Sequence, residues 1–413
     1  MVKIVVLGGS AVATPELARA IAACPGRATP LELVLVGRSA QKLATVAGAA
    51  RLLAAGDPLL AISHTTDVEA ALAGAEFVIN QVRVGGLEAR VYDETFPHSL
   101  GLFGEETIGA GGFANAVRTV PVALEYTRQV ERIAPNALML SFSNPASLVQ
   151  YAVSRYTRVP TVGLCDAPVT LVESIARALG APARELVVDY VGMHHFGWVT
   201  GLWWRGRDVL PEALARASEI VKDVEPAITQ AMGAIPSPYF RFVFHPERML
   251  ARQVGRRARA RELIDLQGEI LADYEQALAT GAQPTAFARR GARWYSMVIA
   301  PVLVALVEGR YAQSQPGPTR HILNVVNGPA IPWLPAEAIV EVPAMVDGGR
   351  IRALAGGAAP LAVRTLVQQN CAYEMLAAEA IVERDRAKAL RALLLSPFIQ
   401  TYEQAEGILA KAW

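Results

Sequence analysis

The stretch KIVVLGGSAVATPE, from Lys3 to Glu16, decides the fold class. Lys3–Leu7 is a short apolar run typical of a buried strand, and two glycines follow it directly. Thr14 is a favourable N-cap and Pro15 suits a first helical turn, so the sequence predicts a helix from there to about Ala23. A glycine turn between such a strand and helix is where a doubly wound sheet binds a dinucleotide.

This glycine turn is the expected nucleotide site, although GGSAVA departs from the G-x-G-x-x-G fingerprint and a plain tight turn is the alternative. The turn residues expected to contact the nucleotide are Gly8, Gly9, Ser10 and Val12. After the second strand an NAD site usually carries an acidic residue, whereas an arginine accommodates the NADP 2′-phosphate. This chain has Arg38 there, so NAD and NADP both stay open, and an exposed loop arginine is the simpler reading.

Strands alternate with helices through the first half of the chain. A helix is expected from about Ala40 to Ala55. The short apolar runs that predict strands are Leu31–Val36, Leu59–Ile62, Phe77–Gln81, Ala137–Ser141 and Thr161–Leu164. This alternation predicts an α/β fold with an N-terminal Rossmann-like, doubly wound parallel sheet.

The second half is mostly helical. The segments with helical spacing of apolar residues are Pro211–Val224, Arg259–Ala279 and Leu361–Ala380, and Ile339–Met345 predicts a strand. We therefore expect a dinucleotide-binding domain over residues 1–190. An α+β domain over residues 191–413 is expected to serve substrate binding, the metal site and oligomerisation.

Composition excludes several classes of protein. The 413 residues carry 39 Lys+Arg and 38 Asp+Glu, a net charge of +1, which argues against a nucleic-acid or anionic-membrane partner. With 52% hydrophobic residues the chain is not disordered. The local basic cluster Arg256–Arg261 is the expected anion-attracting segment.

Three scattered cysteines, and an apolar N-terminal run too short for an export signal, favour a cytoplasmic enzyme. The apolar stretch Trp294–Val307 is too short for a membrane span and predicts a buried helix.

Polar residues and glycines gather between Phe77 and Gly112, which predicts loops over a site. Glu105 and Glu106 are adjacent there, and an acid/base pair is one interpretation, although neighbouring residues seldom face the same ligand. Asn144 follows a predicted strand, at the sheet edge where ligands bind.

Two further strand ends carry metal-binding residue types. Cys165 follows the strand at Thr161–Leu164, and His195 follows the apolar run Leu186–Val191. A thiolate and an imidazole from two strand ends predict a divalent-metal site. A buried thiol acting as a small hydrophobic residue is the alternative for Cys165.

Together these residues resemble glycoside hydrolase family 4, the NAD- and metal-dependent glycosidases. The matching strings, which run through nearly the whole chain in family order, are Thr14–Leu17, Thr65–Asp67, Arg83–Arg90, Gly109–Phe113, Arg118–Pro121, Asn144–Pro145, Gly163–Cys165, His195 and Glu341–Pro343. Later strings, Arg290–Ser296 and Asn327–Pro335, look most like the 6-phospho-β-glucosidase branch. The resemblance implies a lactate/malate dehydrogenase-like architecture.

The resemblance also implies a mechanism distinct from that of paired-carboxylate glycosidases. NAD oxidises the sugar at C3, a base removes the acidified C2 proton, a divalent metal stabilises the enediolate, and the leaving group departs by elimination. Water then adds at C1 and the hydride returns to C3.

Residue roles follow by resemblance. Cys165 and His195 match the ligands of Mn²⁺ or another divalent metal, and Tyr239 matches the proposed C2 base. The positions that match substrate contacts are Arg90, Asn144 and Arg259, and the Asn144 position also matches a cofactor contact. Arg259 suits a sugar 6-phosphate because guanidinium pairs with phosphate, and a solvated basic helix face is the alternative.

Three departures from the family pattern bear on specificity. Asp166 stands where β-specific relatives usually carry Asn, and in α-specific relatives an Asp here is the proposed general acid. His194 replaces a usual Asn, and Arg38 replaces the usual acidic residue. An α-glycosidase acting on a phosphorylated or free sugar is therefore the alternative within the family. A 2-hydroxy acid dehydrogenase and a non-catalytic nucleotide sensor are the alternatives outside it. Relatives form homodimers and homotetramers, so a homo-oligomer is expected.

Overall fold

The computed structural model describes residues 1–312 and 317–413, and its main element is a nine-stranded sheet. The strand order is β13-β12-β11-β6-β5-β4-β1-β2-β3. The strands of this sheet are β1 Val2–Leu7, β2 Leu31–Val36, β3 Leu60–Thr65, β4 Phe77–Asn80, β5 Leu138–Ser141, β6 Thr161–Gly163, β11 Thr319–Val326, β12 Ile339–Asp347 and β13 Arg350–Ala353. The strands β1–β6 pair in parallel, which confirms the predicted doubly wound sheet.

Helices cover both faces of the parallel part. The helices of the first half are α1 Thr14–Ala22, α2 Ala40–Leu53, α3 Val68–Leu72, α4 Gly86–Thr95, α5 Gly109–Ile133, α6 Ala146–Tyr156 and α7 Ala167–Leu179. Ile4 and Val6 of β1 share a buried cluster with α1 and α2, whereas Val5 and Leu7 share another with α3 and α5. Because successive strand residues point to opposite faces, an unbroken apolar run buries both faces of the strand.

Three strands from the second half complete the same sheet. β11 pairs antiparallel with β6 through Asn324 and Gly163, and β12 and β13 follow it. The predicted strand Ile339–Met345 is therefore confirmed as β12, but its place in the N-terminal sheet was not predicted.

A small antiparallel sheet stands beside the large one. It has the order β10-β8-β7, with β9 on β8, and its strands are β7 Leu186–Met193, β8 Phe196–Trp204, β9 Arg207–Asp208 and β10 Ile235–Pro236. Met193 pairs with Phe196, so only His194 and His195 form the turn between β7 and β8.

The later helices confirm a mostly helical second half. They are α8 Leu210–Ala215, α9 Ala217–Ile220, α10 Pro226–Met232, α11 Arg241–Phe244, α12 Pro246–Gln253, α13 Arg259–Thr280, α14 Ala300–Tyr311, α15 Leu361–Glu383, α16 Arg386–Leu395 and α17 Tyr402–Ala412. The buried helix predicted near Trp294–Val307 is a π-helical turn at Tyr295–Ile299 followed by α14. Among the described residues, no helix combines the length and apolar character that crossing a bilayer requires.

Three local predictions were wrong. Thr14 is not the N-cap of α1; it is the first helical residue, and its hydroxyl accepts a hydrogen bond from Gln81 Nε2 at 2.9 Å. The single helix predicted at Pro211–Val224 is divided at Arg216 into α8 and α9. The polar segment Phe77–Gly112 is not mainly loop, because α4 and the start of α5 occupy much of it.

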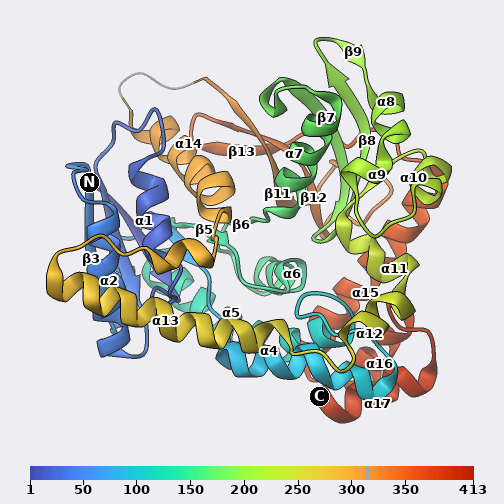
Figure 1. Cartoon of the computed structure of the whole chain (residues 1–413), viewed down its shortest axis with the longest axis horizontal. Helices are drawn as coiled ribbons and strands as arrows, with labels where there is room; N and C mark the ends of the chain where they lie inside the picture. The colour runs from blue at the N-terminus through green and yellow to red at the C-terminus, as the bar shows by residue number, and fades with distance from the viewer. Residues whose placement is uncertain (313–316) are drawn as a thin grey trace.

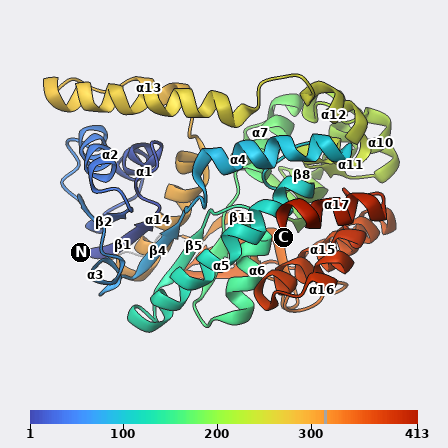
Figure 2. The same ribbon diagram turned by 90° about the horizontal axis from the view of Figure 1, so that it is seen from below.

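Helix α13 runs from α2 to α4. It lies beside α2 at one end and beside α4 at the other (Figures 1 and 2). The hydroxyl of Tyr274 donates a hydrogen bond to the backbone oxygen of Val12 at 2.8 Å, and Gly48 of α2 leaves no room for a Cβ beside Leu278. This helix therefore closes over the glycine turn that follows β1.

Candidate active site

A cavity of about 660 Å³ opens where the parallel strands end. The residues that follow β1, β2, β4, β5 and β6 all contribute to its wall, as the Rossmann architecture requires. The turn between β7 and β8, the residue Tyr239 and one face of α13 complete the lining. The cavity therefore joins the expected nucleotide turn to the expected metal and sugar residues.

The glycine turn approaches its neighbours closely. Gly8 has φ +86°, and a Cβ there would lie 2.9 Å from the carbonyl oxygen of Gln81. Only glycine adopts this conformation without strain and leaves the backbone accessible to a ligand. Ser10 and Val12 also line the cavity. Gly9 does not line the cavity. Its N–H donates a hydrogen bond to the backbone oxygen of Val36 at 2.7 Å, and a Cβ at this position would clash with the backbone of β2. Gly9 therefore allows the turn to pack against β2.

Beyond β2 the cavity wall is basic. Arg38 and Lys42 both line it, and neither side chain forms an ion pair with a carboxylate of the described chain. Burial lowers the pKa of Lys42. Ser39 caps α2 by accepting a hydrogen bond from Lys42 N at 3.4 Å. Two unmatched cations at the start of a helix form an anion-attracting end of the cavity.

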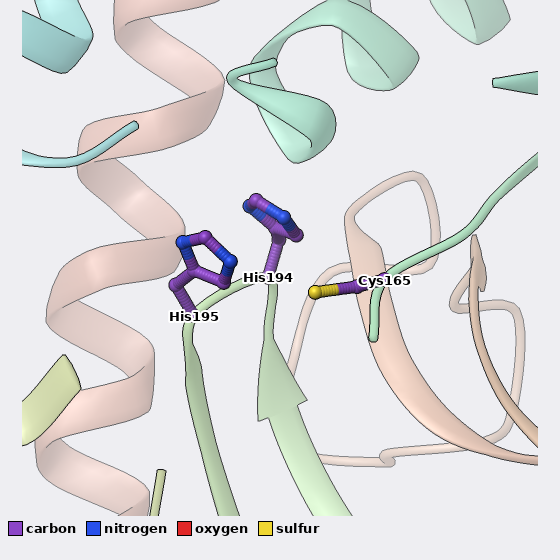
Figure 3. A group of neighbouring side chains, drawn as sticks. All are labelled: Cys165, His194 and His195. Carbon is purple, nitrogen blue, oxygen red and sulfur yellow. The ribbon is translucent and has the colours of Figure 1, made fainter. Parts of the chain in front are cut away.

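Cys165, His194 and His195 lie together at the cavity wall (Figure 3). The nitrogen and sulfur atoms that they offer to a metal all lie within 4.8 Å of one another, and all three residues are buried. His195 has φ +61°, which the two-residue turn imposes, and its Nδ1 lies 2.9 Å from Thr107 Oγ1. A polar partner on Nδ1 leaves Nε2 available as a ligand.

The environment keeps both histidines neutral. Burial lowers the pKa of His194 to about 3, and burial, His194 and Arg241 hold the pKa of His195 well below its ordinary value. Burial, Glu341 and Asp166 raise the pKa of the Cys165 thiol. Neutral imidazoles coordinate metals directly, whereas a thiol must lose its proton on binding.

Tyr239 lies against this group. Its ring stacks on His195 with centroids 3.6 Å apart, and the Arg241 guanidinium lies 5.7 Å from the ring centroid. Burial, together with Glu105 and Cys165, raises the pKa of the phenol well above its ordinary value, so the phenol is protonated here. Asp166 also lines the cavity, and burial raises the pKa of its carboxyl.

A cationic cluster faces the same space. Arg90 lines the cavity and pairs with Glu94 at 2.6 Å and with Glu106 at 2.6 Å, and Arg83 also pairs with Glu106. Burial alone would raise the pKa of Glu106, but the Arg83 and Arg90 guanidiniums lower it. Glu106 is therefore a structural counter-ion.

The other member of the predicted acid/base pair has a separate environment. Glu105 accepts a hydrogen bond from Thr107 Oγ1 at 3.1 Å. Burial and the Glu106 charge raise the pKa of Glu105, while the pKa of Glu106 is lowered. Both residues line the cavity, but Glu106 is occupied by arginines.

Arg290 is the unmatched cation of the cluster. It lines the cavity, its guanidinium lies 4.8 Å from the centroid of the Trp294 ring, and no carboxylate of the described chain pairs with it. Burial, Arg90 and Arg83 lower its pKa. An arginine held near other arginines without a counter-ion marks a place for an anion.

Arg259, the residue expected to hold a phosphate, lies elsewhere. Its side chain is 58% exposed, pairs with Glu262 at 2.5 Å and does not line the cavity. Arg257 and Arg261 of the same basic cluster pair with Asp265 and Glu88. The role expected for Arg259 in substrate binding therefore stays a prediction, and in this structure nearby acids pair with three arginines of the cluster. Asn144, by contrast, lines the cavity as expected.

Sequence reasoning missed Arg290 and His194 as members of the site. Arg290 lies in one of the strings that resemble the family, but its role in the site depends on Arg90 and Arg83, which are distant in the sequence. His194 was noted only as a departure, although the doublet His194-His195 at the tip of a predicted hairpin was a usable signal.

The sequence matches the family described as Family 4 glycosyl hydrolase over residues 3–181, and its C-terminal domain over residues 190–399. A probable 6-phospho-beta-glucosidase of Bacillus subtilis (strain 168) is 30% identical, covering 98% of this chain and 94% of the relative. A 6-phospho-alpha-glucosidase of Leptotrichia buccalis is 26% identical, covering 98% and 96%.

Solved structures agree with this result. The 6-phospho-beta glucosidase from Thermotoga maritima, determined with NAD and glucose-6-phosphate, has a TM-score of 0.87 at 26% identity, covering 99% of this chain and 97% of that one. A lactate dehydrogenase from a deep-sea metagenome library has a TM-score of 0.55 at 14% identity and shows the fold alone. Both confirm the predicted fold class. The chain belongs to family 4 of the glycosyl hydrolases.

Proposed function

We propose that the chain is a glycosidase that hydrolyses 6-phospho-β-glucosides with NAD and a divalent metal. One observation carries the proposal: a single cavity joins the glycine turn, the Cys165–His195 group, Tyr239 and the unmatched Arg290. The solved Thermotoga maritima relative, in forms with NAD, manganese and glucose-6-phosphate, supports this combination of ligands.

The residues of the cavity fit both a dinucleotide and a divalent metal. Gly8 provides a cradle that a Cβ would obstruct, which suits a dinucleotide pyrophosphate. Cys165 and His195 provide one sulfur and one nitrogen donor, which can hold a divalent metal, and the Thermotoga maritima relative was determined with manganese. When bound, the nicotinamide supplies reversible hydride transfer at the sugar C3, and the metal supplies a Lewis acid for the adjacent oxygens.

The chain's own residues have the remaining roles. Tyr239 takes the proton from C2. Burial keeps its phenol protonated in this structure, so the phenolate that this step requires would depend on the positive charge of Arg241 and of the bound metal. Arg290 and Arg90 bind the 6-phosphate, and Asn144 contacts the sugar and cofactor at the end of β5. The glycosidic oxygen leaves by elimination, and water adds at C1, so the net reaction is hydrolysis. Arg259 acts only at long range, through its charge near Arg290.

An α-glycosidase of the same family is the second candidate, and Asp166 favours it. Burial raises the pKa of this carboxyl, which lines the cavity directly beside Cys165. A carboxyl that keeps its proton can protonate a leaving group. The relatives include both kinds of enzyme, with a β-glucosidase the more similar in sequence.

The test is a panel of aryl glucosides, phosphorylated and free, in α and β forms, with NAD⁺, Mn²⁺ and reductant. We expect cleavage of the 6-phospho-β-glucoside and no net accumulation of NADH. Cleavage that continues without NAD⁺ and metal would contradict the mechanism. Asp166→Asn should keep the β-activity; if the enzyme is instead α-specific, this variant should lose turnover.

Three further features are part of the proposal. Residues 1–190 supply the dinucleotide site and Cys165, and residues 191–413 supply His195, Tyr239 and the oligomer contacts. Exposed apolar side chains on the terminal helices, including Leu394 and Tyr402, support a homodimer or homotetramer. Three free thiols support a reducing, cytoplasmic location. Light scattering during size-exclusion chromatography tests the oligomeric state.

A further inference from the structure

His194 occupies an unusual position for a buried imidazole. Its side chain belongs to a residue only 4% exposed, yet no described residue forms a hydrogen bond with either ring nitrogen. Both histidines of the β7–β8 turn line the cavity. Because the ring of His194 lines the cavity and its nitrogens accept or donate no hydrogen bond within the described chain, these nitrogens are available to a ligand.

Ring stacking does not supply that partner. His194 stacks on His195 with centroids 3.7 Å apart and planes 23° apart, and His195 in turn stacks on Tyr239. These contacts cover ring faces, whereas hydrogen bonds and metal bonds form in the ring plane at the nitrogens. The nitrogens of His194 therefore stay available, and one of them lies within 4.8 Å of the donor atoms of Cys165 and His195 (Figure 3).

We propose that His194 is a third protein ligand of the metal that Cys165 and His195 bind. The site then offers two imidazole nitrogens and one thiolate, with the remaining positions open to substrate and water. This inference rests on the proposed function, since it concerns the same metal. In this structure the two imidazole rings are stacked, so they would have to rotate apart to hold one ion together.

The donor set has a consequence for metal choice. Thiolate and imidazole suit borderline ions such as Co²⁺ and Zn²⁺, and affinities rise from Mn²⁺ to Co²⁺ in most sites of this kind. A second nitrogen donor strengthens that bias. The structure therefore predicts a larger preference for Co²⁺ over Mn²⁺ than Cys165 and His195 would give alone.

The test titrates Co²⁺, and separately Mn²⁺, into the full chain and into His194→Asn, with calorimetry and visible absorption as readouts. Asparagine keeps a polar side chain but binds such metals poorly. We expect the variant to bind Co²⁺ at least about tenfold more weakly, to lose less affinity for Mn²⁺, and to change its d–d bands. The thiolate-to-cobalt band should persist. Unchanged Co²⁺ affinity and spectrum would overturn the inference.

Two controls show where Co²⁺ binds and how many histidines bind it. Cys165→Ser should abolish the thiolate band; if it does not, Co²⁺ binds elsewhere and the proposed function itself fails. In the Co²⁺-loaded wild-type chain, paramagnetically shifted imidazole N–H signals should come from two histidines. A signal from only one histidine would overturn the inference without relying on a variant, even if His194→Asn folds poorly.

Discussion

Replacing Arg290 with alanine should weaken recognition of the sugar phosphate and leave the fold intact. Arg290 pairs with no carboxylate of the described chain, so its removal leaves no buried carboxylate without a partner. The variant loses the contact with Trp294, but repulsion from Arg90 and Arg83 also falls. A charge-assisted hydrogen bond contributes about 1.5–3 kcal/mol, which corresponds to about 10- to 150-fold in kcat/KM. The loss is therefore expected in binding, with little change in Tm.

The assay compares wild type, Arg290→Ala and Arg259→Ala on an aryl 6-phospho-β-glucoside. The dissociation constants of glucose 6-phosphate and glucose are measured in parallel. Arg259 is the matched control because it is 58% exposed and paired with Glu262, so its loss should change kcat/KM by less than about threefold. Arg90→Ala is unsuitable as a control, since it removes the arginine partner of Glu94 and leaves Glu106 with Arg83 alone. If Arg259→Ala lost affinity for the phosphate and Arg290→Ala did not, the reasoning would be refuted.

Three other changes test separate parts of the site. Arg38 and Lys42 line the cavity and pair with no carboxylate of the described chain, so Arg38→Ala should lower the affinity for NADP about tenfold and change the affinity for NAD less than threefold. Equal losses of affinity for the two dinucleotides, measured by calorimetry, would show that Arg38 contacts no 2′-phosphate. Gly8→Ala should weaken binding of either dinucleotide at least about tenfold, and unaltered titration curves would argue against the cradle. Burial raises the pKa of Glu374 from 4.5 to about 7, so its favourable contribution is complete below pH 4.5 and is lost as pH rises through 7. Glu374→Gln should therefore be more stable than wild type by about 3 kcal/mol at pH 8 and by almost nothing at pH 4.5. A difference in Tm between the two proteins that is the same at both pH values would contradict this.

The parallel strands were predictable because each is a short apolar run buried on both faces. β2 has the predicted bounds, Leu31–Val36, and β1, β4 and β5 differ from their predicted bounds by one residue at one end. The pairing of β11 with β6 was not predictable. Asn324 pairs with Gly163, which lies 161 residues earlier in the chain, and no local pattern encodes that contact.

Candidate site residues were predictable where they directly follow strands. Asn144, Cys165 and His195 line the cavity because the carboxyl ends of strands converge there. Arginines were harder, since their roles depend on which acids lie nearby. Glu262 lies three residues after Arg259, a spacing that already indicates an ion pair in a helix. That Arg290 has no acidic partner can be seen only in the three-dimensional structure.

The junction between β6 and β11 has a consequence for how the chain can be made and divided. During synthesis, the edge of β6 stays unpaired until residues 319–326 have emerged, so the nucleotide-binding half cannot be complete before then. Gln150 adds to this dependence, because its Nε2 donates a hydrogen bond to the backbone oxygen of Asn324 at 2.9 Å. A fragment that stops at residue 190 therefore lacks three strands of its own sheet. Co-expressing it with a fragment of residues 191–413 would supply those strands in trans.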